Sequence, residues 1–304
     1  MRHGARHLRT TAVVLAASVA LVAGCGDASG HAQPDVAWPF GGAAHIPTVE
    51  QQLYAAAEES LVADCMHGRG MRYVPERRAD PAPEQSGAAI YGLIGPQEAR
   101  LHGYGMGERR VQGASAPPGA NDAARSAMTA EQARAWDRAL LGTPGREATI
   151  EVDGNVFTYR SDACVTLARH DLFGADWDRI RLTAEVAVNT VVAKVWQDAE
   201  VRAAVARWRD CMADDGRDFD SPAEPRKAVD TALAKADLPT ALRLEHETAI
   251  TDADCQRDSG LWDAVVAAQR TAETPTPAAV TSMRTAREKA VAAAREIVGP
   301  SAPS

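Results

Sequence analysis

Four clusters in this sequence contain residue types that bind metals or nucleotides, and each lacks part of the pattern that such chemistry needs. His246-Glu247 begins a zinc-binding helix motif, but no second histidine follows four residues after the first. The alternating glycines of segment 103–107 lack the strand and helix that frame a nucleotide-binding fingerprint. We therefore interpret the histidine pair as a solvated helix face and the glycines as a turn.

Two further clusters contain possible cation ligands, and neither fits the pattern of a metal site. In a calcium loop centred on Gly216, the first and third ligand positions would fall on Cys211 and Ala213, which supply no oxygen side chain. This holds although four acids surround that glycine: Asp214, Asp215, Asp218 and Asp220. Soft ligands for copper(I) lie beside Cys65, namely Met66, His67 and Met71. Helical spacing and the matching Met212 favour a core methionine there instead.

The sequence predicts no catalytic residue, no cofactor and no metal site. No serine sits in the strand-turn-helix pattern of a nucleophile elbow. Only 5% of the residues are aromatic, which gives little support to a platform that stacks on carbohydrate. The net charge of −8, which becomes −11 once the three arginines of the N-terminal signal are removed, argues against nucleic acid as a partner.

Cysteine chemistry is better supported, beginning with Cys25. A basic start, with no acid before Asp27, leads into an apolar run over 12–24, which is shorter than the ~20 residues that span a bilayer. The run ends in small residues, Val22-Ala23-Gly24-Cys25, an arrangement that resembles a bacterial lipobox. That resemblance implies that Cys25 becomes a diacylated N-terminus, carrying a fatty acid such as palmitate. The protein would then lie on the outer face of the cytoplasmic membrane.

The other four cysteines have the even count that predicts two disulfides in an oxidising compartment. Four cysteines can form two disulfides in three ways, and their number alone does not decide among these. The chain around Cys65 repeats around Cys211, with an acid at −1, Met at +1, Gly at +5 and an aromatic at +8. The matched residues are Met66, Gly70 and Tyr73 in the first copy and Met212, Gly216 and Phe219 in the second. This internal duplication predicts the pairs Cys65–Cys164 and Cys211–Cys255.

The layout resembles an uncharacterised family of actinobacterial secreted proteins and lipoproteins with a repeated Trp-x2-Cys-Met-x3-Gly-aromatic signature. The second copy matches from Trp208 to Phe219, whereas the first has Val62 where the tryptophan would stand. Tyr91-Gly92 and the segment 103–105 are also similar to that family. The resemblance covers most of residues 48–270 and implies no activity.

Helical periodicity predicts a mainly α fold with five parts: a signal peptide (1–24), a lipid-anchored flexible tether (25–47), helical unit one (48–177), helical unit two (178–274) and a C-terminal helix and tail (275–304). We expect the tether to reach roughly 25 Å. Asp153-Gly154 between β-rich segments predicts a small hairpin near 148–159. The two units should superpose as helix pairs, with Leu61 and Trp208 buried one turn before their cysteines.

Cap signals mark where several of these helices begin and end. We expect capping boxes at Thr48 with Gln51 and at Thr129 with Gln132, and an N-cap at Ser221. Asp198 should cap a fresh start after a long helical stretch. The last helix, 278–298, is only weakly amphipathic, so we expect it to pack loosely or to stand in solvent.

These observations favour a non-enzymatic extracytoplasmic lipoprotein that binds an envelope protein, a cell-wall component or a small ligand. The membrane contact would be the lipid at Cys25 alone. The alternative is an envelope hydrolase that uses carboxylates. A large pocket with converging carboxylates would favour the hydrolase, and an apolar surface patch would favour partner binding.

Overall fold

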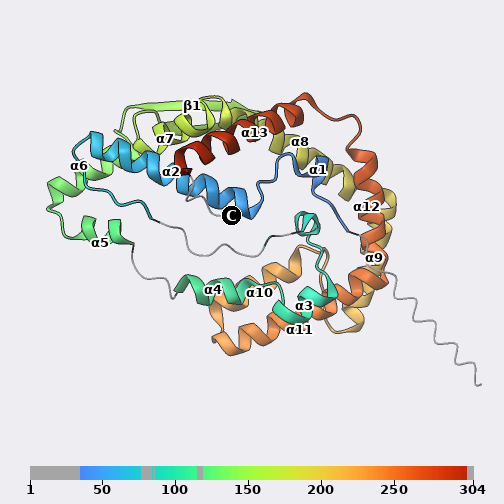
Figure 1. The fold of residues 1–304 in the computed structure, drawn as a ribbon. Coiled ribbons are helices and arrows are strands. Elements are labelled where there is room, and N and C mark those ends of the chain that lie inside the picture. The colour runs from blue at the N-terminus through green and yellow to red at the C-terminus, as the bar shows by residue number, and fades with distance from the viewer. Residues whose placement is uncertain (1–34, 77–83, 85, 115–118, 300–304) are drawn as a thin grey trace, which may run out of the picture. The chain divides into compact units, whose positions relative to one another are not determined.

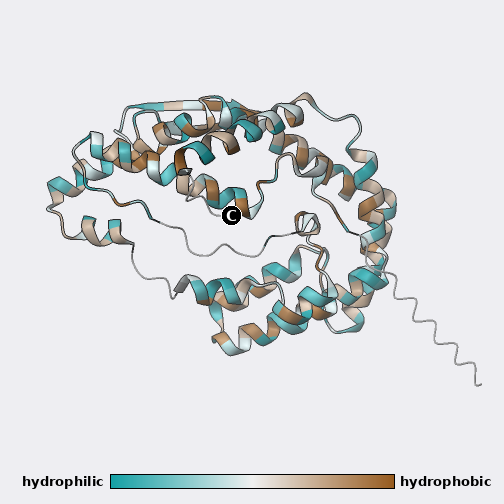
Figure 2. Ribbon diagram, viewed as in Figure 1, coloured by the Kyte–Doolittle hydropathy of each residue, from teal (hydrophilic) through white to brown (hydrophobic). Residues whose placement is uncertain are grey.

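The computed structural model describes residues 35–76, 84, 86–114 and 119–299 of the 304-residue chain. These residues are mainly helical, with one small two-stranded hairpin, as the sequence predicts (Figure 1). Most helices contain both hydrophobic and hydrophilic residues (Figure 2), and the buried hydrophobic ones form the core. Within the described ranges, no helix is long and apolar enough to cross a bilayer. Cys25 and the signal peptide lie outside these ranges.

The elements follow the predicted order closely. The first half contains α1 (Pro39–Gly42), α2 (Thr48–Gly68), the 3₁₀ helix η1 (Gly87–Tyr91), α3 (Pro96–His102), α4 (Met106–Ala114), α5 (Ala120–Ser126), α6 (Ala130–Leu141), β1 (Glu147–Val152) and β2 (Asn155–Arg160). The second contains α7 (Cys164–Phe173), α8 (Trp177–Gln197), α9 (Ala199–Asp214), α10 (Glu224–Lys235), α11 (Leu238–Asp258), α12 (Leu261–Ala272) and α13 (Ala278–Val298).

The hairpin forms at the predicted turn. Strands β1 and β2 are antiparallel, with Val152 opposite Asn155 at the tight end and Glu147 opposite Arg160 at the open end. Both turn residues between them, Asp153 and Gly154, have positive φ, which is the backbone that this two-residue turn requires.

Two disulfides join the predicted pairs of cysteines. Cys65 of α2 bonds Cys164 of α7, and we call these two helices the first disulfide pair. Cys211 of α9 bonds Cys255 of α11, the second disulfide pair. Each bond lies in a small apolar cluster of its own, so covalent and hydrophobic stabilisation act at the same place.

The turn after the first cysteine of each pair has the same geometry. The methionine that follows the cysteine is fully buried in both copies, Met66 and Met212. Its carbonyl accepts a hydrogen bond at 2.9 Å from the N–H five residues on, and Gly70 and Gly216 have φ of 73° and 75°. A left-handed glycine with this bonding pattern ends an α-helix. Both glycines therefore terminate their helices, as their spacing predicts.

The second cysteines occupy different places. Cys164 is the first residue of α7, whereas Cys255 lies near the end of α11. A duplicated helix pair would place both at the same position, so the repeat extends through the cysteine–methionine turn and no further. Trp208 is fully buried, as expected, but Leu61 is only half-buried. Val62, which occupies the register position of the tryptophan, is buried instead.

The C-terminal helix corrects another expectation. Helix α13 packs against α2, α7 and α8, and buries Met283, Ala290 and Ala294 in a cluster that includes Trp177 of α8 (Figure 1). The weakly amphipathic sequence of α13 understated its burial, because two of these core residues are alanines. Alanine adds little to a hydrophobic pattern, yet it lets helices approach closely.

Two of the four predicted caps have the expected form. Thr129 and Gln132 form a reciprocal capping box at α6, and the Asp198 carboxylate accepts from two N–H groups at the start of α9. The other two are wrong. Helix α2 follows Pro47 without a side-chain cap from Thr48, and α10 begins at Glu224, three residues after Ser221.

Candidate functional site

The strongest candidate is a cavity of about 400 Å³ that we call the Tyr91 pocket. Its lining comes from η1, the end of α8, the start of α9 and the loop before α10. The residues are Ile90, Tyr91, Gly92, Trp196, Arg202, Val205, Ser221, Pro222 and Ala223. Most of this wall is apolar, and the volume lies within the range of small-molecule sites.

Backbone geometry fixes the wall at Gly92. This residue ends η1 with a φ of 67°, a conformation that glycine adopts without strain. A Cβ added there would approach the carbonyl oxygen of Pro222 to 3.2 Å. The Gly92 carbonyl accepts hydrogen bonds from Arg226 of α10 and Gln256 of α11. Gly92 therefore allows close packing of the 221–223 loop, and it fixes Tyr91 beside that loop.

The aromatic part of the wall is an edge-to-face pair. The rings of Tyr91 and Trp196 lie 6.4 Å apart at 65°, a favoured geometry for aromatic contact. Tyr91 is almost completely buried, and its hydroxyl has no hydrogen-bond partner among the described residues. Burial, followed by the charge of Glu273, raises the pKa of Tyr91, so the phenol stays neutral. A buried unpaired hydroxyl costs roughly 1–3 kcal/mol, so this side chain is held in the wall by packing and not by a hydrogen bond.

Arg202 supplies the charge of the pocket. Its side chain lies on the first turn of α9, exposed to solvent, and forms no ion pair within the described ranges. It is the one charged residue in the described lining. A guanidinium can donate two parallel hydrogen bonds to a carboxylate. The pocket thus combines an apolar aromatic wall with a single cationic group.

A buried polar network supports this wall from behind. Asp252 of α11 is fully buried and accepts hydrogen bonds from the Tyr104 hydroxyl (2.7 Å), the Trp208 indole N–H (2.9 Å) and the Gln256 amide (2.8 Å). Gln256 also accepts from the N–H of Ile94 and donates to the Gly92 carbonyl, so the network reaches the pocket backbone. Burial raises the pKa of Asp252, against the effect of its three donors.

Packing against α11 also explains the glycines of segment 103–107, which looked like part of a nucleotide-binding motif in the sequence. The glycines of segment 103–107 form the turn that leads into α4. The carboxylate of Glu245 on α11 caps that helix by accepting hydrogen bonds from the N–H groups of Met106 and Gly107. A Cβ on Gly107 would meet the Leu242 side chain at 2.1 Å. These glycines therefore serve close packing against α11, and the turn interpretation is confirmed.

A second cavity, of about 500 Å³, lies beside the segment that precedes α2. Trp38 stacks on His45, with ring centroids 3.8 Å apart, and the opposite wall contains Arg169, Arg181 and Glu185. Both arginines are already paired with carboxylates, Arg169 with Asp178 and Glu58, and Arg181 with Asp178 and Glu185. This cavity therefore offers little uncompensated charge to a ligand.

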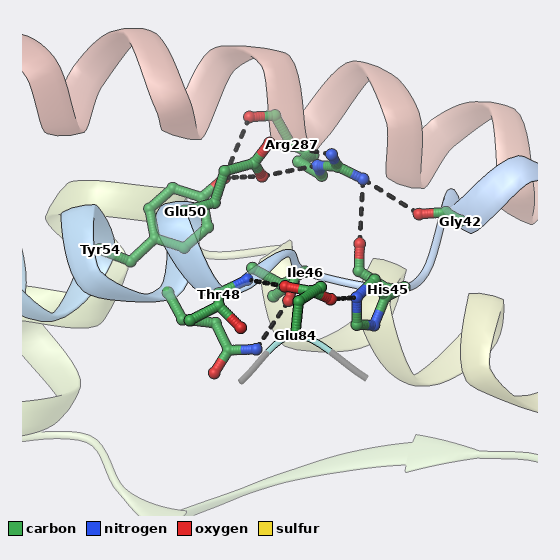
Figure 3. Close-up of polar contacts among 9 residues, drawn as sticks. Gly42, His45, Ile46, Thr48, Glu50, Tyr54, Glu84 and Arg287 are labelled. Atoms are coloured by element: carbon green, nitrogen blue, oxygen red, sulfur yellow. Dashed lines mark hydrogen bonds and ion pairs between the residues drawn. The ribbon is translucent and has the colours of Figure 1, made fainter. Parts of the chain in front are cut away.

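Next to it, Arg287 of α13 binds the N-terminal segment (Figure 3). Its guanidinium donates two hydrogen bonds to Glu50, at 2.6 and 2.9 Å, and one each to the carbonyls of Gly42 and His45, both at 3.0 Å. The Tyr54 hydroxyl completes the group through Glu50. This cluster is saturated with protein partners, so its role is to fix α13 on α2.

In the same view, Glu84 takes the place of the missing cap on α2. Its carboxylate accepts from the N–H of Thr48 at 2.6 Å and contacts the His45 imidazole (Figure 3). The Thr48 N–H, followed by His45, lowers the pKa of Glu84 to about 2. Gln51 donates to the Ile46 carbonyl instead of closing a capping box. The cap comes from a residue 36 positions away, so the local sequence could not reveal it.

The predicted structural residues lie where packing needs them. Tyr73 stacks on Trp136 of α6 in the apolar cluster around the Cys65–Cys164 disulfide. Phe219 packs beside Met212 in the cluster around Cys211–Cys255. His67, one of the copper candidates, contacts the backbone carbonyl of Tyr73. Within the ranges that the structure describes, no three His, Cys, Asp or Glu side chains gather in a group that could hold a metal ion.

Sequence reasoning missed Trp196, Arg202 and Ser221. Only Tyr91-Gly92 carried a signal, through its similarity to a family motif. The remaining lining residues are scattered over more than a hundred positions, and nothing in their local pattern connects them. Comparison of the chain with known protein families, with curated proteins and with solved structures finds no match. The function therefore has to be argued from the geometry.

Proposed function

We propose that this protein is an extracytoplasmic lipoprotein, anchored to the outer face of the cytoplasmic membrane through Cys25, that binds an envelope ligand or partner without catalysing a reaction. The apolar run that ends in Val22-Ala23-Gly24-Cys25 supports the anchor. The two disulfides support an oxidising compartment, because structural disulfides are rare where thiols are kept reduced.

The Tyr91 pocket is the main support for the proposed binding role. Its walls are apolar and aromatic, and its one charged side chain, Arg202, has no protein partner in the described ranges. Sites that bind small molecules combine such walls with a few oriented polar groups. A general acid or base would need a titratable partner beside it, and the described residues that line this pocket include no carboxylate and no histidine.

The best-positioned carboxylates elsewhere have structural partners. Asp252 is sealed from solvent by three donors, and Glu245 caps a helix. Glu50 is bound to Arg287, and Asp178 lies between two arginines. These groups stabilise the fold, which supports binding over hydrolysis by paired carboxylates.

The anchor is tested by metabolic labelling with a palmitate analogue, comparing wild type with Cys25→Ala. We expect label on the wild type alone and release of the variant from the membrane. The binding role is tested by crosslinking in intact membranes followed by pull-down and identification of captured molecules. Turnover of a wall-derived substrate that Glu185→Gln abolishes while the fold stays intact would favour the hydrolase instead.

A further inference from the structure

We infer that the Tyr91 pocket takes an amphipathic monocarboxylate, with its apolar body against Trp196 and its carboxylate on Arg202. This inference rests on the proposed binding function and names its ligand class. The argument starts from the charge balance of the pocket. A single guanidinium faces a cavity whose other residues are uncharged, so the pocket matches one negative charge and not a doubly charged phosphate.

The guanidinium is also free to bind. Most other arginines near the cavities are occupied: Arg226 donates to the Gly92 carbonyl, and Arg169, Arg181 and Arg287 are paired with carboxylates. Arg202 has no such partner among the described residues, although it lies in a chain whose net charge is negative. A carboxylate ligand would supply the partner that the protein does not.

The rest of the wall requires an apolar body. Ile90, Trp196 and Val205 are half-buried side chains that share the cavity with the buried Pro222. Transfer of apolar surface from water stabilises a complex by ~25 cal/mol per Å², so a hydrocarbon or aromatic group gains most here. Ser221 adds a polar side chain to the wall without adding charge.

The wall is held in place before a ligand arrives. Gln256 links the buried Asp252 to both Gly92 and Ile94, and Arg226 holds the Gly92 carbonyl from the other side. These contacts fix η1, and Asp198 caps α9 four residues before Arg202. A preformed pocket loses less conformational entropy on binding, which favours recognition of a small ligand.

The test uses the full chain in the membranes in which it is made. A diazirine analogue of decanoate and the matching diazirine alcohol are photocrosslinked at increasing concentration, and labelled peptides are mapped by mass spectrometry. We expect the acid to label peptides that line the pocket and unlabelled decanoate to compete. Arg202→Gln should raise the half-labelling concentration of the acid by roughly ten- to a hundredfold, since a charge-assisted hydrogen bond is lost. The alcohol should be unaffected by this change.

Matched variants separate charge from packing. Arg202→Lys should recover part of the preference for the acid, and Arg134→Gln, an exposed arginine on α6, should change nothing. Trp196→Ala should weaken labelling by the acid and the alcohol together. Equal labelling by acid and alcohol, or an unchanged response in Arg202→Gln, would overturn the carboxylate assignment.

The two proposals fail in distinguishable ways. If neither probe labels the pocket while Cys25→Ala still releases the protein and crosslinking captures an envelope partner, the ligand class is wrong and the binding lipoprotein stands. If a hydrophobic peptide competes with the acid and decanoate does not, the pocket serves a protein partner, and the monocarboxylate inference falls. If the acid binds but the chain stays in the membrane without Cys25, the anchor is wrong.

Discussion

The first and second disulfide pairs begin with the same cysteine–methionine turn and support it with different chemistry. In the first pair, the buried tryptophan beside the turn is Trp136, which comes from α6 and donates to a backbone carbonyl. In the second, it is Trp208 of α9 itself, which donates to the buried carboxylate of Asp252. A repeated sequence motif thus specified a repeated turn, while each surrounding core was completed independently.

The position of the second cysteine makes the same point. Cys164 begins its helix and Cys255 lies near the end of its helix, so the disulfide joins the repeated turn to unrelated parts of the chain. Matched spacing on both sides of a cysteine indicates shared local structure. It does not establish that two whole helical units descend from one.

The largest expected effect is the loss of a disulfide. The two bonds close loops with sequence separations of 99 and 44 residues. The chain-entropy model gives ~4.7 and ~4.0 kcal/mol for these loops. Cys65→Ser with Cys164→Ser should therefore lower the free energy of unfolding more than Cys211→Ser with Cys255→Ser, as measured by urea denaturation. The reverse order would mean that the cores, and not the loop lengths, dominate the comparison.

Removing the tryptophans compares the two cores directly. Trp208→Ala should lower the free energy of unfolding by ~3–5 kcal/mol through cavity formation, and it also removes one donor from a buried carboxylate. Trp136→Ala should cost less, because its indole N–H bonds a backbone carbonyl near solvent. Equal losses in thermal or chemical unfolding would show that the Asp252 bond adds nothing to the second core.

The Asp252 network makes the second pair less stable as the pH rises. Burial raises the pKa of Asp252 above its ordinary value of 3.8. As the pH rises from below that value, the unfolded chain loses this proton first, so the contribution of Asp252 to stability falls. Asp252→Asn keeps the side-chain shape without the charge. The variant should gain stability relative to wild type as the pH rises above about 4, in urea titrations at several pH values. A constant difference between the two proteins would contradict the raised pKa.

Two helix caps give the smallest expected effect, and the cap at Glu84 has the opposite pH dependence. Glu84→Ala uncaps α2 and Asp198→Ala uncaps α9, and each should cost ~1 kcal/mol. Glu84 has a pKa lowered from 4.5 to about 2, so its contribution is present above that range and is lost as the pH falls through it. Hydrogen exchange at the Thr48 amide should accelerate in Glu84→Ala and stay unchanged in Asp198→Ala. Unchanged exchange in both variants would show that solvent caps α2 equally well.

The caps also show what the sequence could and could not predict. Thr129 with Gln132 and Thr48 with Gln51 carry the same local signature, and only the first forms a capping box. The second is displaced because Glu84 reaches the same N–H group from a distant segment. Local patterns predicted most helices, the hairpin and both disulfides, since these depend on neighbours or on a repeated motif. The Asp252 network and the Tyr91 pocket depend on segments that meet only in the folded chain.

The bond between Arg287 and Glu50 sets an order of events as the chain folds. A chain emerges from its N-terminus, and these two residues are separated by 237 positions. Helix α2 therefore has to wait until α13 (Ala278–Val298) has emerged before Tyr54 and its apolar neighbours are covered. Until α13 arrives, the apolar side chains around Tyr54 remain exposed in the nascent chain. Helix α13 thus covers the apolar face of α2 around Tyr54, and a product truncated before α13 would leave that face exposed.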